Sequence, residues 1–110
     1  MGMAYKKLGA ASIASASNTT VYTAPASTQT EVKVCWICNT TASDVTLELW
    51  HVASGGSASD ANKLMPAVTI PANDFKKIQA DWQMSTSDTI QAKGSTNVAI
   101  TITLYGVEIS

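Results

Sequence analysis

Residues 31–52, which read EVKVCWICNTTASDVTLELWHV, place apolar side chains at every second position of two successive runs. That spacing is the period of a pleated strand, in which alternate side chains share one face. Residues 40–44 separate the runs and are rich in the residue types that end strands and form turns. The stretch therefore predicts two antiparallel strands joined as a hairpin with one apolar face. The residues expected on that face are Val32, Val34, Trp36 and Cys38 of the first run and Val45, Leu47 and Leu49 of the second.

A hairpin alone is at best marginally stable, so other strands must cover its apolar face. Further strands are predicted at residues 19–23, 64–70, 75–84, 89–93 and 98–109, separated by turns, and residues 3–9 form either a short strand or an extended arm. About eight short strands at this spacing predict an all-β fold, an antiparallel β-sandwich of jelly-roll-like architecture. The expected core residues are Val34, Trp36, Leu47, Leu49, Ile78, Trp82, Ile100 and Ile102.

The first 18 residues differ in composition from the rest of the chain. Residues 10–18 are mostly Ala and Ser, and Ile13 is their one large apolar residue. A segment with so little apolar bulk is not expected to hold a core position. We therefore expect residues 1–18 to form an N-terminal arm with an irregular Ala/Ser-rich segment, and residues 19–110 to form the sandwich domain. Residues 53–62, with the sequence ASGGSASDAN, are expected to form a flexible surface loop.

Composition excludes several classes of partner. The 110 residues suffice for one domain with a single core, and the 7 basic residues, all lysines, are balanced by 8 acidic ones. Without a basic surplus or any arginine, direct nucleic-acid binding is not expected. No segment approaches the roughly 18 apolar residues of a membrane span, and no apolar run of a secretory signal follows the N-terminus, so we expect no membrane partner and synthesis in the cytoplasm.

The residues that could carry chemistry do not form a recognisable catalytic or metal site. Cys35 and Cys38 form a CxxC pattern within a strand, where an odd spacing points the two sulfurs to opposite faces, so we expect buried, unlinked thiols. His51 is the only histidine, which leaves too few ligands for zinc. No nucleophile elbow of the GxSxG type is present. We therefore expect a non-enzymatic protein without a catalytic residue, metal or cofactor.

Trp50 is the aromatic residue that the alternation places away from the apolar face. It shares its face with Glu48, so we expect it to be exposed or to lie between subunits. An exposed tryptophan could also act as a platform for a sugar ring, and a carbohydrate-binding module therefore remains an alternative.

Several segments resemble small virion proteins of tailed bacteriophages. These are AYKKLG at residues 4–9, TTVYTAPAST at 19–28, the CNTT turn at 38–41, IPANDF at 70–75, STSDTIQAK at 85–93 and VAITITLYGVEIS at 98–110. The resemblance covers most of the chain and lies in turns and strands. It implies a β-sandwich built into a phage particle, as a capsid decoration (cement) protein or, alternatively, as a neck, tail or tail-fibre component. It implies a virion location after synthesis in the host cytoplasm, and the major capsid protein or another virion protein as partner.

A sandwich of this size leaves edge strands and apolar surface that need covering, and several linked contacts strengthen binding to a shell. We therefore expect a homo-oligomer, a trimer, whose residues 1–13 reach onto a neighbour or onto the shell. Tyr5 and Leu8 are expected to be the apolar anchors of this interface, and Lys6 and Lys7 to face an acidic partner surface. Trp50 is the remaining candidate interface residue.

Overall fold

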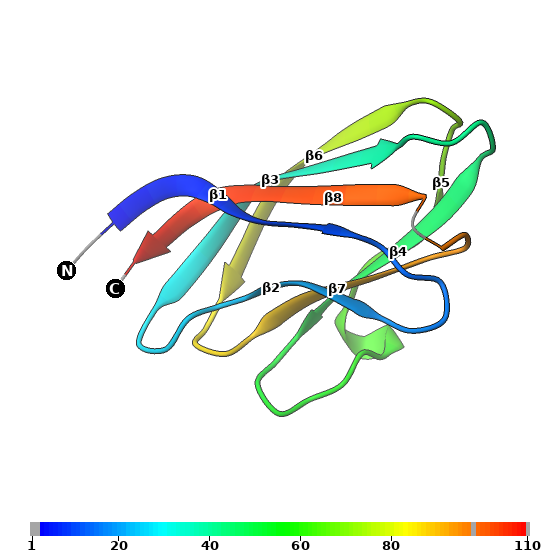
Figure 1. Ribbon diagram of the computed structural model, residues 1–110. Helices are drawn as coiled ribbons and strands as arrows, with labels where there is room; N and C mark the ends of the chain where they lie inside the picture. Colours follow the sequence, from blue (N-terminus) through cyan, green and yellow to red (C-terminus); the bar gives the residue numbers. More distant parts are fainter. Residues whose placement is uncertain (1–2, 98, 110) are drawn as a thin grey trace.

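The computed structural model describes residues 3–97 and 99–109 and forms two four-stranded antiparallel sheets packed face to face (Figure 1). The all-β sandwich predicted from the sequence is confirmed. A short 3-10 helix, η1 (Asp60–Asn62), lies in the longest loop. The strands are β1 (Met3–Ser12), β2 (Thr19–Thr23), β3 (Gln29–Asn39), β4 (Val45–Val52), β5 (Lys63–Ile70), β6 (Phe75–Met84), β7 (Thr89–Gly94) and β8 (Ile100–Ile109).

The strand order is that of a jelly roll. Sheet A has the order β1-β8-β3-β6 and sheet B the order β2-β7-β4-β5. The antiparallel pairs β4–β5, β3–β6, β2–β7 and β1–β8 are those of one long hairpin folded over on itself, with successive pairs alternating between the two sheets. The pairs β3–β8 and β4–β7 join these hairpin segments into the two sheets.

The predicted hairpin over residues 31–52 is wrong, because β3 lies in sheet A and β4 in sheet B. Alternation specifies which face of a strand is buried but not which strand lies beside it. The intervening turn crosses between the sheets and is fixed by Asn39, which is 1% exposed. Its amide nitrogen donates to the carbonyl oxygens of Ser43 at 2.9 Å, Ile70 at 3.0 Å and Pro71 at 3.2 Å.

The predicted apolar face of β3 is also partly wrong. Val32 is buried as expected, but the inward residues beyond it are Cys35 and Ile37. Val34, expected in the core, is half-buried on the outer face, and Trp36 is 37% exposed there. The register of β3 against β8 shifts between Val32 and Val34, so one extra residue enters the strand. A bulge of this kind moves every later side chain to the opposite face.

The N-terminal residues do not form an arm. β1 pairs with β8 along its length, from Met3 opposite Ile109 to Ser12 opposite Thr101, and is an edge strand of sheet A. Ile13 is fully buried and its backbone N–H donates to the carbonyl oxygen of Ile100 at 2.9 Å, so the expectation that the Ala/Ser-rich segment holds no core position is wrong. Residues 1–2 lie outside the described residues.

The core between the sheets contains most of the other residues expected there. Leu47 and Leu49 of β4 are fully buried, as are Ile100 and Ile102 of β8 to within 1%. Further fully buried side chains come from the loop after β1, from β7 and from β8: Ile13, Ile90, Ala92 and Leu104. Ile78 and Trp82 of β6 are half-buried at the rim and pack against this core. The core thus leaves two outer sheet faces on which contacts with other molecules can form.

Candidate functional site

The two outer faces of the sandwich differ in how far the chain covers them. On sheet B, Trp50 and Val52 point outward yet are only 7% and 2% exposed. The Lys63 ammonium lies 5.4 Å from the centroid of the Trp50 ring and 2.8 Å from the Glu48 carboxylate. The loop of residues 53–62 follows directly, and η1 contacts β4. The large apolar side chains of this outer face are therefore covered by the protein's own chain, while smaller outward residues such as Thr20 and Thr69 are exposed.

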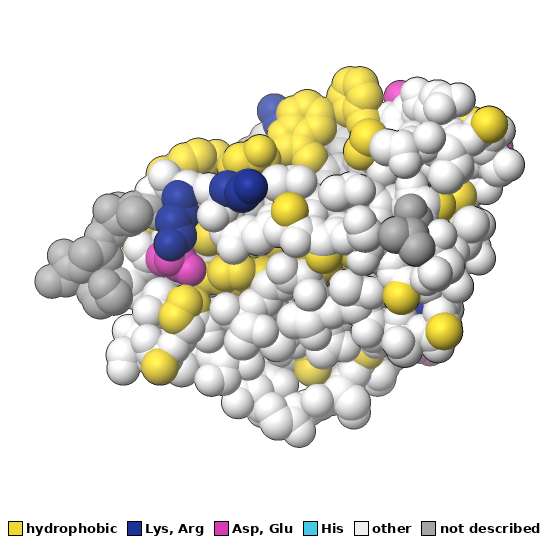
Figure 2. Space-filling model, in the orientation of Figure 1, with side chains coloured by type: hydrophobic (Ala, Val, Ile, Leu, Met, Phe, Trp, Pro, Cys, Tyr) yellow, Lys and Arg dark blue, Asp and Glu magenta, His cyan; other side chains and the backbone are white. Residues whose placement is uncertain are grey.

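The outer face of sheet A is open and carries aromatic side chains. Directly opposed residues of antiparallel strands share a face, so the register gives rows across the four strands. Figure 2 shows hydrophobic side chains gathered along the upper margin, where Figure 1 places β3 and β6. The outward apolar residues of these rows are Tyr5, Val34, Trp36, Cys38, Phe75, Tyr105 and Val107.

Trp36 and Phe75 form the aromatic centre of this face. Their ring centroids lie 5.4 Å apart with an interplanar angle of 40°, and Phe75 is 58% exposed. Lys77 is directly opposite Trp36 in the ladder, with its ammonium 5.9 Å from the centroid of the Trp36 ring. An aromatic pair beside a cation can bury apolar area and also attract an anionic group.

The other end of the same face is built by β1 and β8. Tyr5 is 64% exposed and lies opposite Val107, and Lys7 lies opposite Tyr105. Tyr105 and Val107 are half-buried. The open face therefore extends from one edge of sheet A to the other.

A charged cluster on the same face is internally neutralised. The Lys33 ammonium is in an ion pair with Glu31 and lies 3.6 Å from the Asp81 carboxylate. The hydrogen bond to Glu31 raises the pKa of Lys33 above its ordinary value. Lys33 is therefore occupied by its own neighbours and is not the group on this face that is free to attract an anion.

A second polar cluster joins the two sheets next to the chain termini. The Tyr22 hydroxyl donates to the Glu108 carboxylate at 2.5 Å and lies 2.8 Å from the Thr30 hydroxyl. Lys6 completes the cluster with an ion pair to Glu108 at 2.7 Å. Burial and the bond to Glu108 raise the pKa of Tyr22 to about 12, and the bonds from Lys6 and Tyr22 lower the pKa of Glu108. The cluster fastens the sheets together and leaves Lys6 engaged within the chain.

Asp88 organises the loops at the same end of the sandwich. Its carboxylate accepts hydrogen bonds from His51 Nε2 at 3.0 Å and from the backbone N–H groups of Ser85 at 3.0 Å and Ser54 at 3.1 Å. Burial raises the pKa of Asp88, but the bonds from His51 and the two backbone groups outweigh it and hold that pKa below its ordinary range. All three donors are structural, so the pair of His51 and Asp88 serves as a loop anchor.

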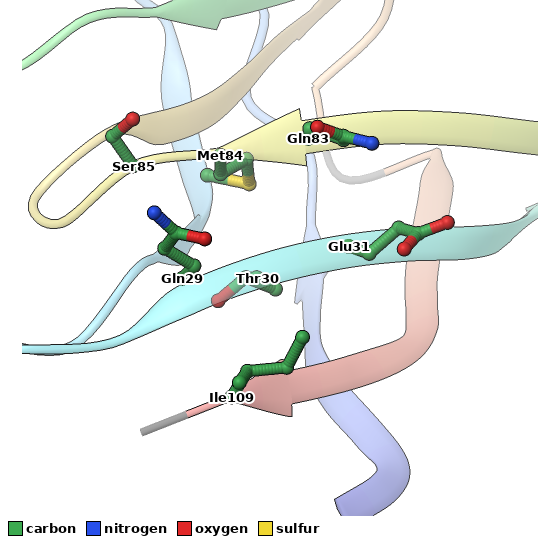
Figure 3. A pocket seen from close by; sticks show the side chains of 7 residues that line it. All are labelled: Gln29, Thr30, Glu31, Gln83, Met84, Ser85 and Ile109. Atoms are coloured by element: carbon green, nitrogen blue, oxygen red, sulfur yellow. The ribbon is translucent and has the colours of Figure 1, made fainter. Parts of the chain in front are cut away.

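A shallow hollow of about 390 Å³ lies where β3 begins and β6 and β8 end (Figure 3). Its wall combines the apolar side chains of Met84 and Ile109 with the carboxamides of Gln29 and Gln83. Gln29 and Gln83 are exposed, and the hydroxyl of Thr30, which also lines the hollow, already bonds to Tyr22. The hollow has no buried, unpartnered polar group that would define a ligand.

The residues predicted as an interface occupy different environments. Tyr5 and Lys7 lie on the open face of sheet A. Lys6 is paired with Glu108, and Leu8 is half-buried against the core. The expectation that Trp50 is exposed is wrong, since it is 7% exposed with Lys63 over its ring, and its alternative place between subunits stays a prediction. The missed residues are Trp36, hidden from the sequence pattern by the bulge, and Phe75, which the alternation of residues 75–84 does place on the face opposite the core.

The two cysteines point to opposite faces, as predicted. Cys35 is buried, and burial raises its thiol pKa to about 12, whereas Cys38 is exposed, so the expectation of two buried thiols is wrong. Within residues 3–97 and 99–109, no group of three or more His, Cys, Asp or Glu side chains is arranged to hold a metal ion.

Comparisons with models of protein families, with curated proteins and with solved structures found no match. In the part of the chain that the structure describes, no helix has the length and apolar character needed to cross a membrane.

Proposed function

We propose that the protein is a non-enzymatic structural component of a tailed-bacteriophage particle, and specifically a capsid decoration protein that stabilises the shell. The resemblance of its turns and strands to small virion proteins supports the class. The observation that carries a binding role is the contrast between the two outer faces. On the face of sheet B, Trp50 and Val52 are buried, with Lys63 over Trp50, whereas the face of sheet A exposes Trp36, Phe75 and Tyr5.

Exposed aromatic side chains gathered on one face mark an interaction surface, because a monomer gains nothing from leaving them in water. The face is the outer side of four paired strands, which suits contact with another protein surface better than enclosure of a small substrate. Jelly rolls also occur in viral capsid proteins, and this likeness supports the proposal by analogy of fold.

We also propose a homotrimer on the particle, because several linked contacts strengthen attachment to a symmetric shell. The contact would involve Tyr5 and Lys7 of β1 as part of the open face, since residues 3–12 are a strand of the sandwich. Deleting residues 1–13 would remove β1 and buried Ile13, so point variants are the appropriate test.

The proposal is tested by adding purified protein to phage capsids that lack it and measuring occupancy by sedimentation and electron microscopy. We expect saturable binding to the capsid surface and a loss of binding in the double variant Trp36→Ser and Phe75→Ser. The matched control is Lys93→Ser with Thr20→Ser, which changes the other outer face and should bind as the wild type. Circular dichroism confirms that both variants are folded.

Three outcomes contradict a decoration role carried by the open face. Binding only to necks or tails, located by immunogold labelling, would indicate the alternative place in the virion. Saturable binding on a glycan array that requires Trp36 would indicate a carbohydrate-binding module. Equal capsid binding by the Trp36→Ser, Phe75→Ser variant and its control would show that the open face is not the contact.

A further inference from the structure

The strand β6 is an edge strand of sheet A, and most of its residues 75–79 are exposed. Among the described strands, only β3 pairs with it, and residues 75–79 do so without a register shift, from Phe75 opposite Cys38 to Gln79 opposite Val34. The other edge strands are less suited to pairing. β2 has five residues, β5 contains Pro66 and shifts register, and β1 is irregular near Gly9, whose backbone packs closely against β2.

The side chains along this edge determine which kind of strand could pair with it. Phe75 and Lys77 point to the outer face, next to Trp36, and Ile78 points to the core side, where it is half-buried. Lys76 lies opposite buried Ile37 and so also points to the core side of the edge. The order along the edge is therefore apolar, basic, basic, apolar, from Phe75 to Ile78.

Neither lysine of this edge forms an ion pair within the described residues, although Lys77 lies over the Trp36 ring. The ion pairs of the described residues involve Lys6, Lys33 and Lys63, and none involves Lys76 or Lys77. The nearest acidic residue in the sequence, Asp74, accepts a hydrogen bond from the backbone N–H of Phe75 at 2.8 Å. Both ammonium groups are therefore available to an external carboxylate.

We propose that the edge of β6 at residues 75–79 binds an extended, acidic segment of a partner protein by strand addition. Backbone hydrogen bonds would extend sheet A by one strand, as in other cases of β-augmentation. Opposed side chains then require the pattern apolar, acidic, acidic, apolar, with the carboxylates facing Lys77 and Lys76 and the apolar residues facing Ile78 and Phe75. The identity of the partner as a virion protein rests on the proposed function.

A second copy of this chain fits the edge poorly. Antiparallel pairing of residues 75–79 with the same residues of another copy would place Lys77 directly opposite its own counterpart, and like charges in that position are destabilising. Lysines on an edge strand also disfavour its pairing with other neutral or basic strands. The edge is therefore selective for an acidic partner.

The test uses capped, fluorescently labelled decapeptides with the core Val-Glu-Glu-Val between threonine and serine flanks. The composition-matched control has the core Glu-Val-Val-Glu, and the charge-reversed control Val-Lys-Lys-Val. We expect weak, salt-sensitive binding of the first peptide by fluorescence anisotropy, with amide shifts in the NMR spectrum centred on residues 75–79. The double variant Lys76→Glu and Lys77→Glu should bind that peptide about tenfold more weakly and prefer the basic one, whereas Lys93→Glu should behave as the wild type.

Equal binding of the two composition-matched peptides, no binding at all, or shifts confined to other strands would overturn the proposal. So would a wild-type oligomer that dissociates in the Lys76→Glu, Lys77→Glu variant, because the edge would then be occupied by a second copy. The particle role is judged separately. Capsid binding without peptide binding refutes only the strand-addition site, and peptide binding without capsid binding refutes only the role in the particle.

Discussion

The Tyr22 hydroxyl lies 2.5 Å from the Glu108 carboxylate and thereby connects β2 of sheet B to β8 of sheet A. The Thr30 hydroxyl on β3 bonds to the same phenol and the Lys6 ammonium on β1 pairs with Glu108, so side chains of four strands form the cluster. Tyr22 is only 7% exposed, and the hydrogen bonds of its hydroxyl are made to protein side chains.

The first prediction concerns the stability that this phenol supplies. Tyr22→Phe removes the hydrogen bond and leaves Glu108 and Thr30 with fewer partners, which should lower the free energy of unfolding by about 1–3 kcal/mol. Urea unfolding at pH 7 measures the change. Tyr105→Phe, on the open face, is the control and should stay within about 0.5 kcal/mol of the wild type. Equal effects of the two substitutions would contradict a structural role for the cluster.

The same residue predicts an alkaline limit of stability. The pKa of Tyr22 is raised to about 12, above the value of about 10 for a tyrosine in an unfolded chain. The stabilisation of the neutral phenol is fully present below pH 10 and is lost as the pH rises toward 12. Urea midpoints at pH 9, 10 and 11 should fall more steeply for the wild type than for Tyr22→Phe, and parallel curves would refute the assignment.

Asp88 predicts a loss of stability in acid. Its folded pKa is lowered, so its stabilisation is present above the unfolded value of about 3.9 and is lost as the pH falls through the folded value. Asp88→Asn should destabilise the fold by about 1–3 kcal/mol at pH 7, because His51, Ser85 and Ser54 lose a common charged acceptor. The difference from the wild type should shrink between pH 5 and pH 3. Asp60→Asn, on the exposed loop, is the control at pH 7.

The two thiols should differ in reactivity. Cys38 is exposed, whereas Cys35 is fully buried with a pKa raised to about 12, and only thiolates attack an aromatic disulfide reagent rapidly. Reaction of the native protein with this reagent at pH 8 should therefore label Cys38 alone, and the same reaction in denaturant should label both cysteines. Cys38→Ser should abolish the fast reaction. A fast native reaction that persists in that variant would mean that Cys35 is accessible.

The sequence predicts strands well where alternation is unbroken and fails where geometry interrupts it. The bounds of β6, Phe75–Met84, match the prediction because every second residue keeps its face. In β3 an extra residue near Lys33 reverses the faces of Cys35 and Trp36, and no residue type in the sequence marks that bulge.

Pairing and coverage are harder to predict than strands. The composition of residues 40–44 suits a hairpin turn as well as a crossing between sheets, and only the hydrogen bonds of Asn39 show which one forms. Alternation places Trp50 on an outer face correctly. It does not predict that Lys63, 13 residues further along the chain, lies over the ring. The sequence does not predict the open aromatic face for a related reason, since its alternation places Trp36 in the core.

The last prediction concerns the close approach of β8 to the bulged part of β3. A Cβ added at Gly106 would lie 2.1 Å from the carbonyl oxygen of Glu31, a backbone atom that cannot move without disturbing the strand pair. Gly106→Ala should therefore lower the free energy of unfolding by roughly 1–3 kcal/mol or more. Gly94→Ala is the matched control, because its nearest neighbour would be the carbonyl oxygen of Thr96 at 3.4 Å, an ordinary contact. The free energies of unfolding of both variants are measured by thermal and urea unfolding. A Gly106→Ala protein as stable as Gly94→Ala would show that β3 and β8 are not this closely packed.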